Sequence, residues 1–207
     1  AGSFENGLAQ ISELLSIQGR VVPVTTDEAT LVADFADGRS VEGQADIYEH
    51  QFTHGTAVKR LRYKTKVSIC QAALKAIVEA DLITVGPGSV YTSILPLFKV
   101  DGFAGALKRS KAKLAYICNL MTEPGQTEDL FVQDFAELLE AELPGRRFNY
   151  VIFNTKQPTV RQLKRYRLER ERAPVKLDPE RSKTAYYLVG ADLISRKLYR
   201  KPKTDSS

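Results

Sequence analysis

The chain has 207 residues, of which 43% are hydrophobic and 27% are charged, and its formal net charge is +5. This length and composition fit one globular domain that buries about 70% of the surface of its unfolded chain. No apolar run approaches the roughly 18 residues of a membrane-spanning helix, and the first residues lack the features of a signal peptide. The two cysteines make no disulfide framework. We therefore expect a cytoplasmic protein with no membrane partner.

The first third of the chain combines one helical pattern with several short apolar or alternating segments. Asp37 and Gly38 form a strong hairpin-turn signal between two of these segments. The expected elements are, in chain order, a helix (8–18), a strand (21–24), the two arms of an antiparallel hairpin (30–36 and 40–47), a polar connection (49–55) and another alternating strand (57–64).

From residue 68 onward, helical patterns alternate with short buried strands, which favours βαβ units and a mainly parallel sheet. The expected elements are a helix (69–80), a strand (82–85), two helical pieces (91–98 and 103–109), a strand (114–118), a helix (128–143), a strand (150–153), an arginine-rich helix (160–170) and a last strand (185–189).

We therefore predict an α/β fold. It is a three-layer sandwich with a mainly parallel, Rossmann-like sheet and a small antiparallel hairpin extension at about residues 30–64. One domain is expected over residues 1–200, followed by a polar tail at 201–207.

Small polar residues follow four of the predicted strands at the point where each one ends. They are Thr25 and Thr26, the segment 86–93, the segment 119–122, and the pair 154–155. Ligands in open α/β sheets bind outside the carboxyl ends of the strands. If these four strands are parallel, their loops converge on one crevice. We expect this crevice to bind a negatively charged small molecule.

The segment from Gly86 to Ser93 is the most informative of these loops. Its glycines allow positive φ angles and a close approach of a ligand to the backbone. Ser89 is a candidate cap for the following helix, whose first N–H groups suit an anion. Tyr91, Thr92 and Ser93 add hydroxyl groups. The alternative is a tight strand-to-helix turn without a ligand, since the segment matches neither standard nucleotide-binding fingerprint.

Two other loops allow the same pair of interpretations. Thr25 and Thr26 precede Asp27, and residues of these types also stabilise ordinary turns. Asn119 and Thr122 lie in a loop that ends at Thr127, which is a plausible helix cap. Each loop taken alone is explained more simply by turn chemistry.

Metal and acid–base chemistry have few candidates in this sequence. His50 and His54 lie four residues apart in a predicted loop without a neighbouring cluster of ligands, so a metal site there is disfavoured. Any acid–base role would fall to carboxylates, of which Asp27, Glu28 and Glu123 are nearest to the predicted crevice.

Arginine and lysine are concentrated between residues 161 and 172. A solvated helix face is the favoured interpretation, although a surface that contacts phosphates would use the same charges. The sequence has neither an aromatic ribonucleoprotein motif nor zinc-finger spacing, so we expect no dedicated nucleic-acid partner.

Four strings together resemble the gluconeogenesis-factor family (YvcK/CofD-like), which is related to 2-phospho-L-lactate transferase. The resemblance runs from the first predicted helix to about Ser195. The strings are PVTTDE (23–28), GPGSVYTSI (86–94), NLMTEPGQT (119–127) and NT (154–155).

This resemblance implies a cytoplasmic nucleotide-binding fold. Gluconeogenesis factors are associated with growth on gluconeogenic carbon sources, cell shape and cell-wall synthesis, and they bind UDP-sugars. The transferase relatives join a phospholactyl-type group to a deazaflavin, with a guanine nucleotide donor and a divalent metal. We expect a UDP-sugar-binding regulatory protein with no assigned catalytic residue or metal ligand. The alternative is a metal-dependent 2-phospho-L-lactate transferase-like enzyme, for which magnesium would be the metal.

The resemblance also implies ligand-side positions. They are Thr25, Thr26, Gly86, Gly88, Ser89, Tyr91, Thr92, Ser93, Asn119, Thr122, Tyr166 and Arg200. Leu97 departs from the family pattern, which usually has Asn there. The family also normally begins with a Gly-rich strand–loop–helix and Asp-rich segments that this sequence lacks. We therefore expect the C-terminal portion of the family fold, working as a homo-oligomer or with a missing N-terminal segment.

Overall fold

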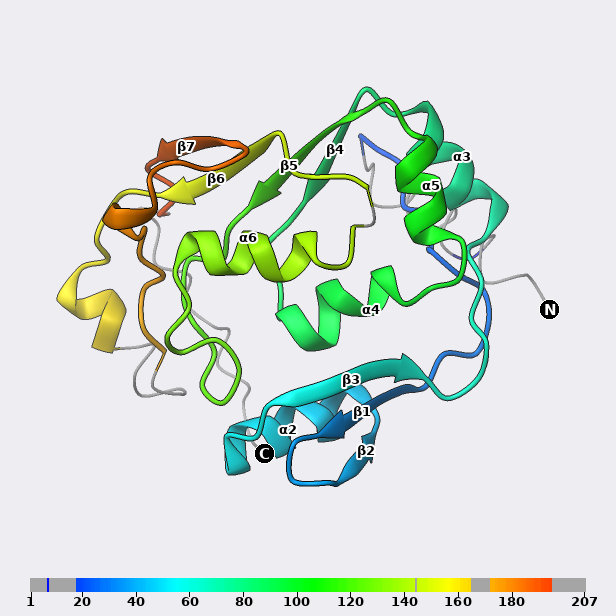
Figure 1. The fold of residues 1–207 in the computed structure, drawn as a ribbon, viewed down its shortest axis with the longest axis horizontal. Coiled ribbons are helices and arrows are strands. Elements are labelled where there is room, and N and C mark those ends of the chain that lie inside the picture. The colour runs from blue at the N-terminus through cyan, green and yellow to red at the C-terminus, as the bar shows by residue number, and fades with distance from the viewer. Residues whose placement is uncertain (1–6, 8–17, 144, 165–171, 195–207) are drawn as a thin grey trace, which may run out of the picture.

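A parallel sheet of four strands forms one side of the molecule in the computed structural model (Figure 1). The structure describes residues 7, 18–143, 145–164 and 172–194. The sheet order is β4-β5-β6-β7, and each neighbouring pair is parallel. This confirms the predicted Rossmann-like α/β fold. The strands are β4 (Leu82–Val85), β5 (Lys113–Ile117), β6 (Tyr150–Asn154) and β7 (Tyr187–Ala191).

Helices precede β4 and occupy the connections between these strands, as the alternation in the sequence predicts. They are α3 (Gln71–Glu79), the π-helical turn η1 (Val90–Ile94), α4 (Leu95–Phe98), α5 (Phe103–Arg109), α6 (Val132–Glu140) and the short 3-10 helix η2 (Pro179–Arg181). The predicted bounds of β4 and α5 match the observed ones. The long helix predicted from residue 128 begins only at Val132.

A small antiparallel sheet forms the opposite side of the molecule, with the order β2-β1-β3. Its elements are β1 (Leu31–Phe35), β2 (Ser40–Glu42), β3 (Val58–Tyr63) and the helix α2 (Gln44–His54). The hairpin at Asp37 and Gly38 is confirmed, and Gly38 has the positive φ of 87° that the turn requires.

The second arm of the hairpin is much shorter than we predicted. A strand over 40–47 and a polar connection over 49–55 were expected, but β2 ends at Glu42 and α2 follows. Gly43 ends the strand, because its φ of 92° does not continue an extended backbone. The buried positions of α2 are Ile47, His50 and Gln51, which share one helical face. Two of these three residues are polar, and this hid the helical pattern.

The strand predicted at 21–24 is also wrong, since the structure assigns no strand to these residues. The segment lies instead against the start of α3. The carbonyl of Val24 accepts a hydrogen bond from the Cys70 N–H at 2.9 Å, and the Cys70 thiol donates to the carbonyl of Pro23 at 3.0 Å. These bonds attach the segment to a loop and leave it outside both sheets.

One hydrophobic core joins the two sheets through the helices between them. Phe35 and Ile47 from the small sheet and its helix belong to the same buried cluster as Tyr116 of β5 and Phe135 of α6. The described residues therefore form three layers, with α4 and α6 between the parallel and antiparallel sheets (Figure 1). None of the described helices has the length and apolar character needed to cross a membrane.

Candidate functional site

The loops that follow β4 and β5 are joined by one side chain, Asn119. Its amide Nδ2 donates to the Gly88 carbonyl at 2.9 Å, and its Oδ1 accepts from the Gly88 N–H at 3.4 Å. The Tyr116 hydroxyl also donates to Oδ1, at 3.5 Å. Because β4 and β5 are parallel neighbours, both loops leave the sheet at its carboxyl edge. The structure therefore brings Gly88 and Asn119 together, as the strand-end argument predicted.

The glycines of the first loop do not use the positive φ angles that glycine allows. Positive values occur at six other glycines, and neither Gly86 nor Gly88 is among them. A Cβ on Gly86 would meet no atom within 4 Å, and one on Gly88 would lie at an ordinary 3.6 Å from the Cβ of Ser93. Backbone strain therefore does not require glycine at these two positions, and Gly86 borders open space.

Ser89 does not cap the following helical turn with its side chain. Its carbonyl accepts from the N–H groups of Ser93 and Ile94, while its hydroxyl donates to Oε1 of Gln126 at 3.3 Å. The amide Nε2 of Gln126 is buried and has no hydrogen-bond partner among the described residues. Buried polar atoms usually have partners, so this donor marks a place for a bound water or ligand group beside Ser89. Gln126 was not among the predicted site residues, although it lies inside one of the family strings.

The three hydroxyl residues of η1 point to different surroundings. Ser93 is exposed next to Gly88. Thr92 is only 6% exposed, and its carbonyl accepts a hydrogen bond from the Gln44 side chain. Tyr91 is half-buried and lines a hollow toward β3, and its burial raises the pKa of its hydroxyl. Of these three residues, only Ser93 is exposed.

The loop after β5 is held largely by its own polar groups. The Thr127 hydroxyl accepts from the Glu123 N–H at 2.8 Å, so Thr127 closes the loop and is not the predicted cap of α6. That cap lies at Phe131, whose N–H donates to the Asp134 carboxylate at 2.8 Å. The Thr122 hydroxyl accepts from the Ala173 N–H at 3.1 Å. Thr122 is 3% exposed and serves to hold the segment at Ala173.

An ion pair that the sequence argument did not foresee lies beside this loop. Arg172 lies 3.6 Å from the Glu123 carboxylate and donates to the Tyr48 hydroxyl at 3.1 Å. We had placed Arg172 on a solvated helix face, and its partly buried ion pair corrects that interpretation. Glu123 is 9% exposed and structurally engaged. Arg161 and Lys164, from the same basic segment, are exposed.

The first predicted loop does not join the other two in the described part of the chain. The Thr25 hydroxyl accepts from the Asp27 N–H at 3.1 Å, which is the turn chemistry given above as the alternative. The Asp27 carboxylate accepts from the Ser68 N–H at 2.8 Å. Thr26 and Glu28 are exposed. These bonds connect the segment to the entry of α3 and not to Gly88 or Asn119.

The two histidines lie in α2 and not in a loop as predicted. Their rings stack with centroids 4.3 Å apart, and the His50 ring also lies 4.3 Å from that of Phe35. His50 is 8% exposed, with its Nε2 3.3 Å from the Asp37 carboxylate. Within the described ranges, no three His, Cys, Asp or Glu side chains are placed to hold one metal ion. The pair therefore packs the small sheet.

The remaining predicted positions fall into two groups. After β6, Asn154 makes a local turn in which its Nδ2 donates to the Lys156 carbonyl at 2.6 Å. Tyr166 and Arg200 lie outside the described residues, as do most of the predicted helix at 8–18, residues 165–170 of the arginine-rich helix and the tail at 201–207.

Comparison with known proteins gives one family over nearly the whole chain. The family model described as 2-phospho-L-lactate transferase CofD matches residues 1–194. The gluconeogenesis factor of Bacillus subtilis is 32% identical over 194 residues, which cover 93% of this chain and 60% of that protein. A Thermotoga maritima protein provisionally named a gluconeogenesis factor is 40% identical over 168 residues, covering 81% of this chain and 52% of that protein.

A solved structure supports the same relationship. The crystal structure of a UPF0052-family protein from Bacillus halodurans matches with a TM-score of 0.81 and 27% identity, over 91% of this chain and 60% of that one. The chain thus spans about half to three fifths of the length of these relatives.

Proposed function

The chain belongs to the CofD family of 2-phospho-L-lactate transferase, and from this membership we propose that it is a UDP-sugar-binding regulatory protein of the gluconeogenesis-factor type. Its roles would be in gluconeogenic growth, cell shape and cell-wall synthesis in the cytoplasm. The similarity to gluconeogenesis factors over 81% and 93% of the chain supports this assignment.

The observation that carries the proposal is the junction of the loops after β4 and β5. Asn119 fixes the backbone of Gly88, and Ser89 reaches Gln126 across the same edge of the sheet. Parallel α/β sheets bind their ligands outside this edge. We assign the nucleotide part of the ligand to this junction, with Gly86 bordering it.

The junction offers groups that suit a phosphorylated ligand. The Gln126 Nε2 is a buried donor without a partner among the described residues, and the Ser93 hydroxyl is an exposed donor next to Gly88. The open space at Gly86 lets a ligand approach the backbone. Phosphate oxygens accept hydrogen bonds from all three kinds of donor: amide, hydroxyl and backbone N–H.

Isothermal titration of the full chain with UDP-glucose tests the proposal. We expect saturable binding, and we expect glucose alone to give no signal because the nucleotide carries the interaction. Absence of UDP-glucose binding by a folded chain would remove the proposal for this protein.

Two substitutions locate the site. Ser93→Ala removes one hydroxyl donor, so we expect UDP-glucose to bind about fivefold more weakly. Stability should not change, because the Ser93 side chain is exposed. Ser182→Ala, at another exposed serine, is its control.

Gly86→Val fills the open space and should block binding, whereas Gly19→Val, also free of neighbours within 4 Å, should not. Unchanged affinity in folded Gly86→Val would place the ligand elsewhere.

The matching family model favours a second candidate, a transferase that joins a phospholactyl-type group to a deazaflavin. Such an enzyme uses a divalent metal, and the described residues offer no group of three His, Cys, Asp or Glu ligands for one. We therefore derive no metal-dependent step for this chain. Mass spectrometry of the chain with a deazaflavin acceptor, a guanine-nucleotide donor and magnesium distinguishes the two, because only the transferase forms a product.

A further inference from the structure

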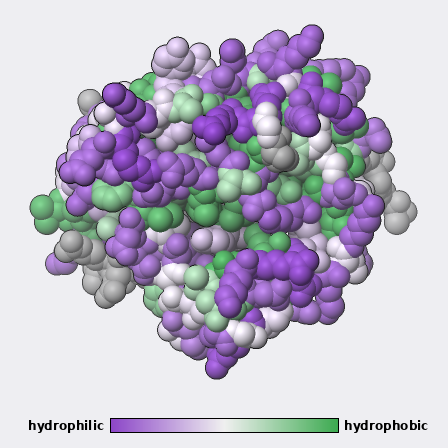
Figure 2. All heavy atoms as spheres, in the orientation of Figure 1, coloured by the Kyte–Doolittle hydropathy of each residue, from purple (hydrophilic) through white to green (hydrophobic). Residues whose placement is uncertain are grey.

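A groove lies between β3 and the helices α4 and α6, and none of its lining residues belongs to the junction of Gly88 and Asn119. Two adjoining hollows, of about 330 and 280 Å³, share Arg60, Leu61 and Lys99 in their walls. Leu95 and Leu138 add apolar surface on the helical side. In Figure 2, hydrophobic residues show in a band above the small sheet, with hydrophilic surface on both sides. We call this feature the β3 groove.

The charge of the β3 groove is mostly positive. Arg62, Lys66 and Lys99 each form an ion pair, at 3.3, 2.9 and 2.7 Å, with Asp34, Asp101 and Glu142 respectively. Lys59 and Arg60 also line the groove and form no ion pair with any described residue. Neither cation is therefore neutralised by an ion pair, although Arg60 lies opposite Asp34 in the ladder and helps to lower the pKa of that carboxyl.

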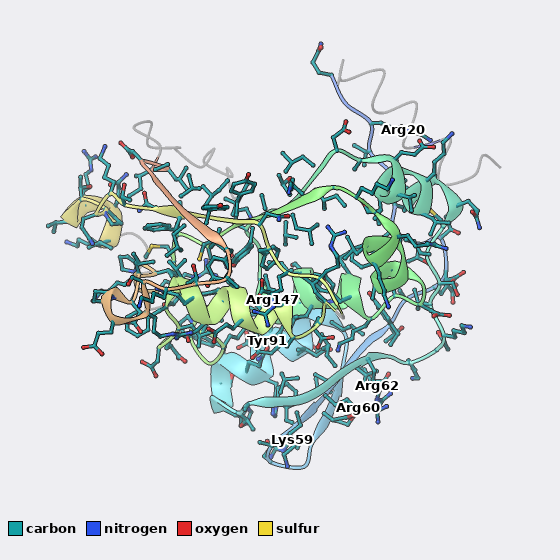
Figure 3. All side chains as sticks on the ribbon, turned by 45° about the horizontal axis from the view of Figure 1, so that its top comes forward. Arg20, Lys59, Arg60, Arg62, Tyr91 and Arg147 are labelled. Atoms are coloured by element: carbon teal, nitrogen blue, oxygen red, sulfur yellow. The ribbon has the colours of Figure 1, made fainter. Side chains whose placement is uncertain are left out.

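An irregularity in β3 places these two cations on the same surface. Asp34 of β1 pairs with Arg60, whereas the next residue, Phe35, pairs with Val58, so Lys59 is an extra residue in the ladder. Adjacent residues of a regular strand point to opposite faces, but a bulge redirects a side chain. Figure 3 shows Lys59, Arg60 and Arg62 along β3, with Tyr91 on the helical side.

The backbone of β3 is available for pairing on the side of the groove. The small sheet has the order β2-β1-β3, so β3 is an edge strand, and it is the strand nearest α4 (Figure 1). The Lys64 N–H donates to Thr30 at 2.9 Å. In an antiparallel ladder the bonding direction alternates, so the backbone groups of Tyr63 and Leu61 point away from β1.

From these observations we propose that the β3 groove binds an extended acidic segment of a partner protein, which adds a strand to β3 next to Leu61 and Tyr63. Backbone pairing supplies the alignment, as in other cases of strand addition. Acidic side chains of the partner neutralise Lys59 and Arg60, and its apolar side chains cover the half-buried Leu138. This binding is independent of the nucleotide site proposed above.

The test is fluorescence polarisation of the full chain with a labelled seven-residue peptide in which glutamate and valine alternate. We expect saturable binding that weakens as salt is raised, because exposed charges are screened. The double variant Lys59→Glu/Arg60→Glu should bind about tenfold more weakly. The double variant Lys108→Glu/Arg109→Glu makes the same change in net charge at two exposed residues of α5, and it should bind as the parent does. Circular dichroism shows that both variants are folded.

Two further probes decide between modes of binding. The same peptide with every amide N-methylated has no N–H group left to donate to a strand on either edge, and we expect it not to bind. Equal binding of that peptide would overturn strand addition. A single-stranded oligouridylate of equal charge is the last probe. The proposal is wrong if the oligouridylate binds better than the peptide and the double variant Lys59→Glu/Arg60→Glu abolishes the binding of the oligouridylate. The groove would then recognise nucleic acid. The proposal is also overturned if neither the peptide nor the oligouridylate binds. In that case the bulge and the charges of β3 would serve to prevent edge-to-edge aggregation.

Discussion

Gly125 lies against the backbone of Gln51 in α2 without room for a side chain. A Cβ built on Gly125 would be 2.0 Å from the Gln51 carbonyl oxygen, and the φ of Gly125 is +73°. The loop after β5 and the helix of the small sheet therefore cross at a position where only glycine fits. This crossing connects the loop after β5 to the small sheet.

We expect Gly125→Ala to destabilise the protein by about 3 kcal/mol or more, because it adds both a steric clash and an unfavourable φ. Urea unfolding followed by circular dichroism measures the change. Gly145→Ala separates the two causes, since Gly145 has a φ of +72° and no neighbour within 4 Å. It should cost only about 1 kcal/mol. Equal effects of the two substitutions would show that the crossing is looser than described.

Gln133 of α6 is fully buried and holds the segment that leads to β7. Its Nε2 donates to the carbonyls of Asp178 and Arg181 at 2.9 and 3.2 Å, and its Oε1 accepts from the Asp178 N–H at 3.0 Å. Gln133→Leu keeps the size but leaves these backbone groups without partners, which should cost about 2–4 kcal/mol in unfolding free energy. Gln71→Leu, at an exposed residue, is the control and should change stability little.

Asn119→Asp should weaken the junction of the two loops. The substitution replaces the donor that bonds the Gly88 carbonyl at 2.9 Å with a carboxylate oxygen, which repels that carbonyl. We expect a loss of about 1–3 kcal/mol in stability and weaker UDP-glucose binding. The same replacement at the half-buried Asn154, whose amide donates to the Lys156 carbonyl in a local turn, should leave UDP-glucose binding unchanged. Full UDP-glucose affinity in Asn119→Asp would argue against the proposed site.

Stability should fall at alkaline pH because of the buried thiol of Cys118. Burial raises the pKa of this thiol from an ordinary value of 9.0 to about 12. Between these values the unfolded chain has lost the proton and the folded chain retains it, so rising pH favours unfolding. The slope is about 1.4 kcal/mol for each pH unit. Urea midpoints from pH 8 to 11 measure it.

Cys118→Ala isolates the thiol from the other buried groups. Burial also raises the pKa of the Tyr116 hydroxyl, and that of Tyr186 to about 12, so tyrosines contribute in the same direction at higher pH. The variant should show a shallower decline above pH 9 than the parent. Identical pH profiles would mean that the Cys118 thiolate is tolerated in the fold.

The parallel sheet was predictable because its local signals agree with its tertiary contacts. The run 82–85 is apolar, is flanked by polar or glycine residues and becomes β4 with the same bounds. The run 21–24 is also short and apolar, but it contains Pro23 and bonds to the backbone N–H and the thiol of Cys70, which no local pattern reveals. A strand needs a partner, and the sequence does not say which apolar runs obtain one.

The candidate site was predictable only to the level of its loops. The positions of Gly88 and Asn119 follow from adjacent parallel strands, which the alternating pattern indicates. The role of Gln126 depends on the direction of one side chain, and that of Tyr91 depends on the π-helical turn η1, which directs it toward β3. The shape of such a turn is set by packing and leaves no periodic signal.

The continuous core has a consequence for how this molecule melts. Phe35 and Ile47 belong to one buried cluster with side chains of the helices and of the parallel sheet, so we expect the small sheet not to unfold while the remainder stays native. Calorimetry should accordingly record a single cooperative transition. A destabilising substitution in the core under α2 would then lower the stability of the whole protein and would not cause local unfolding of the small sheet alone.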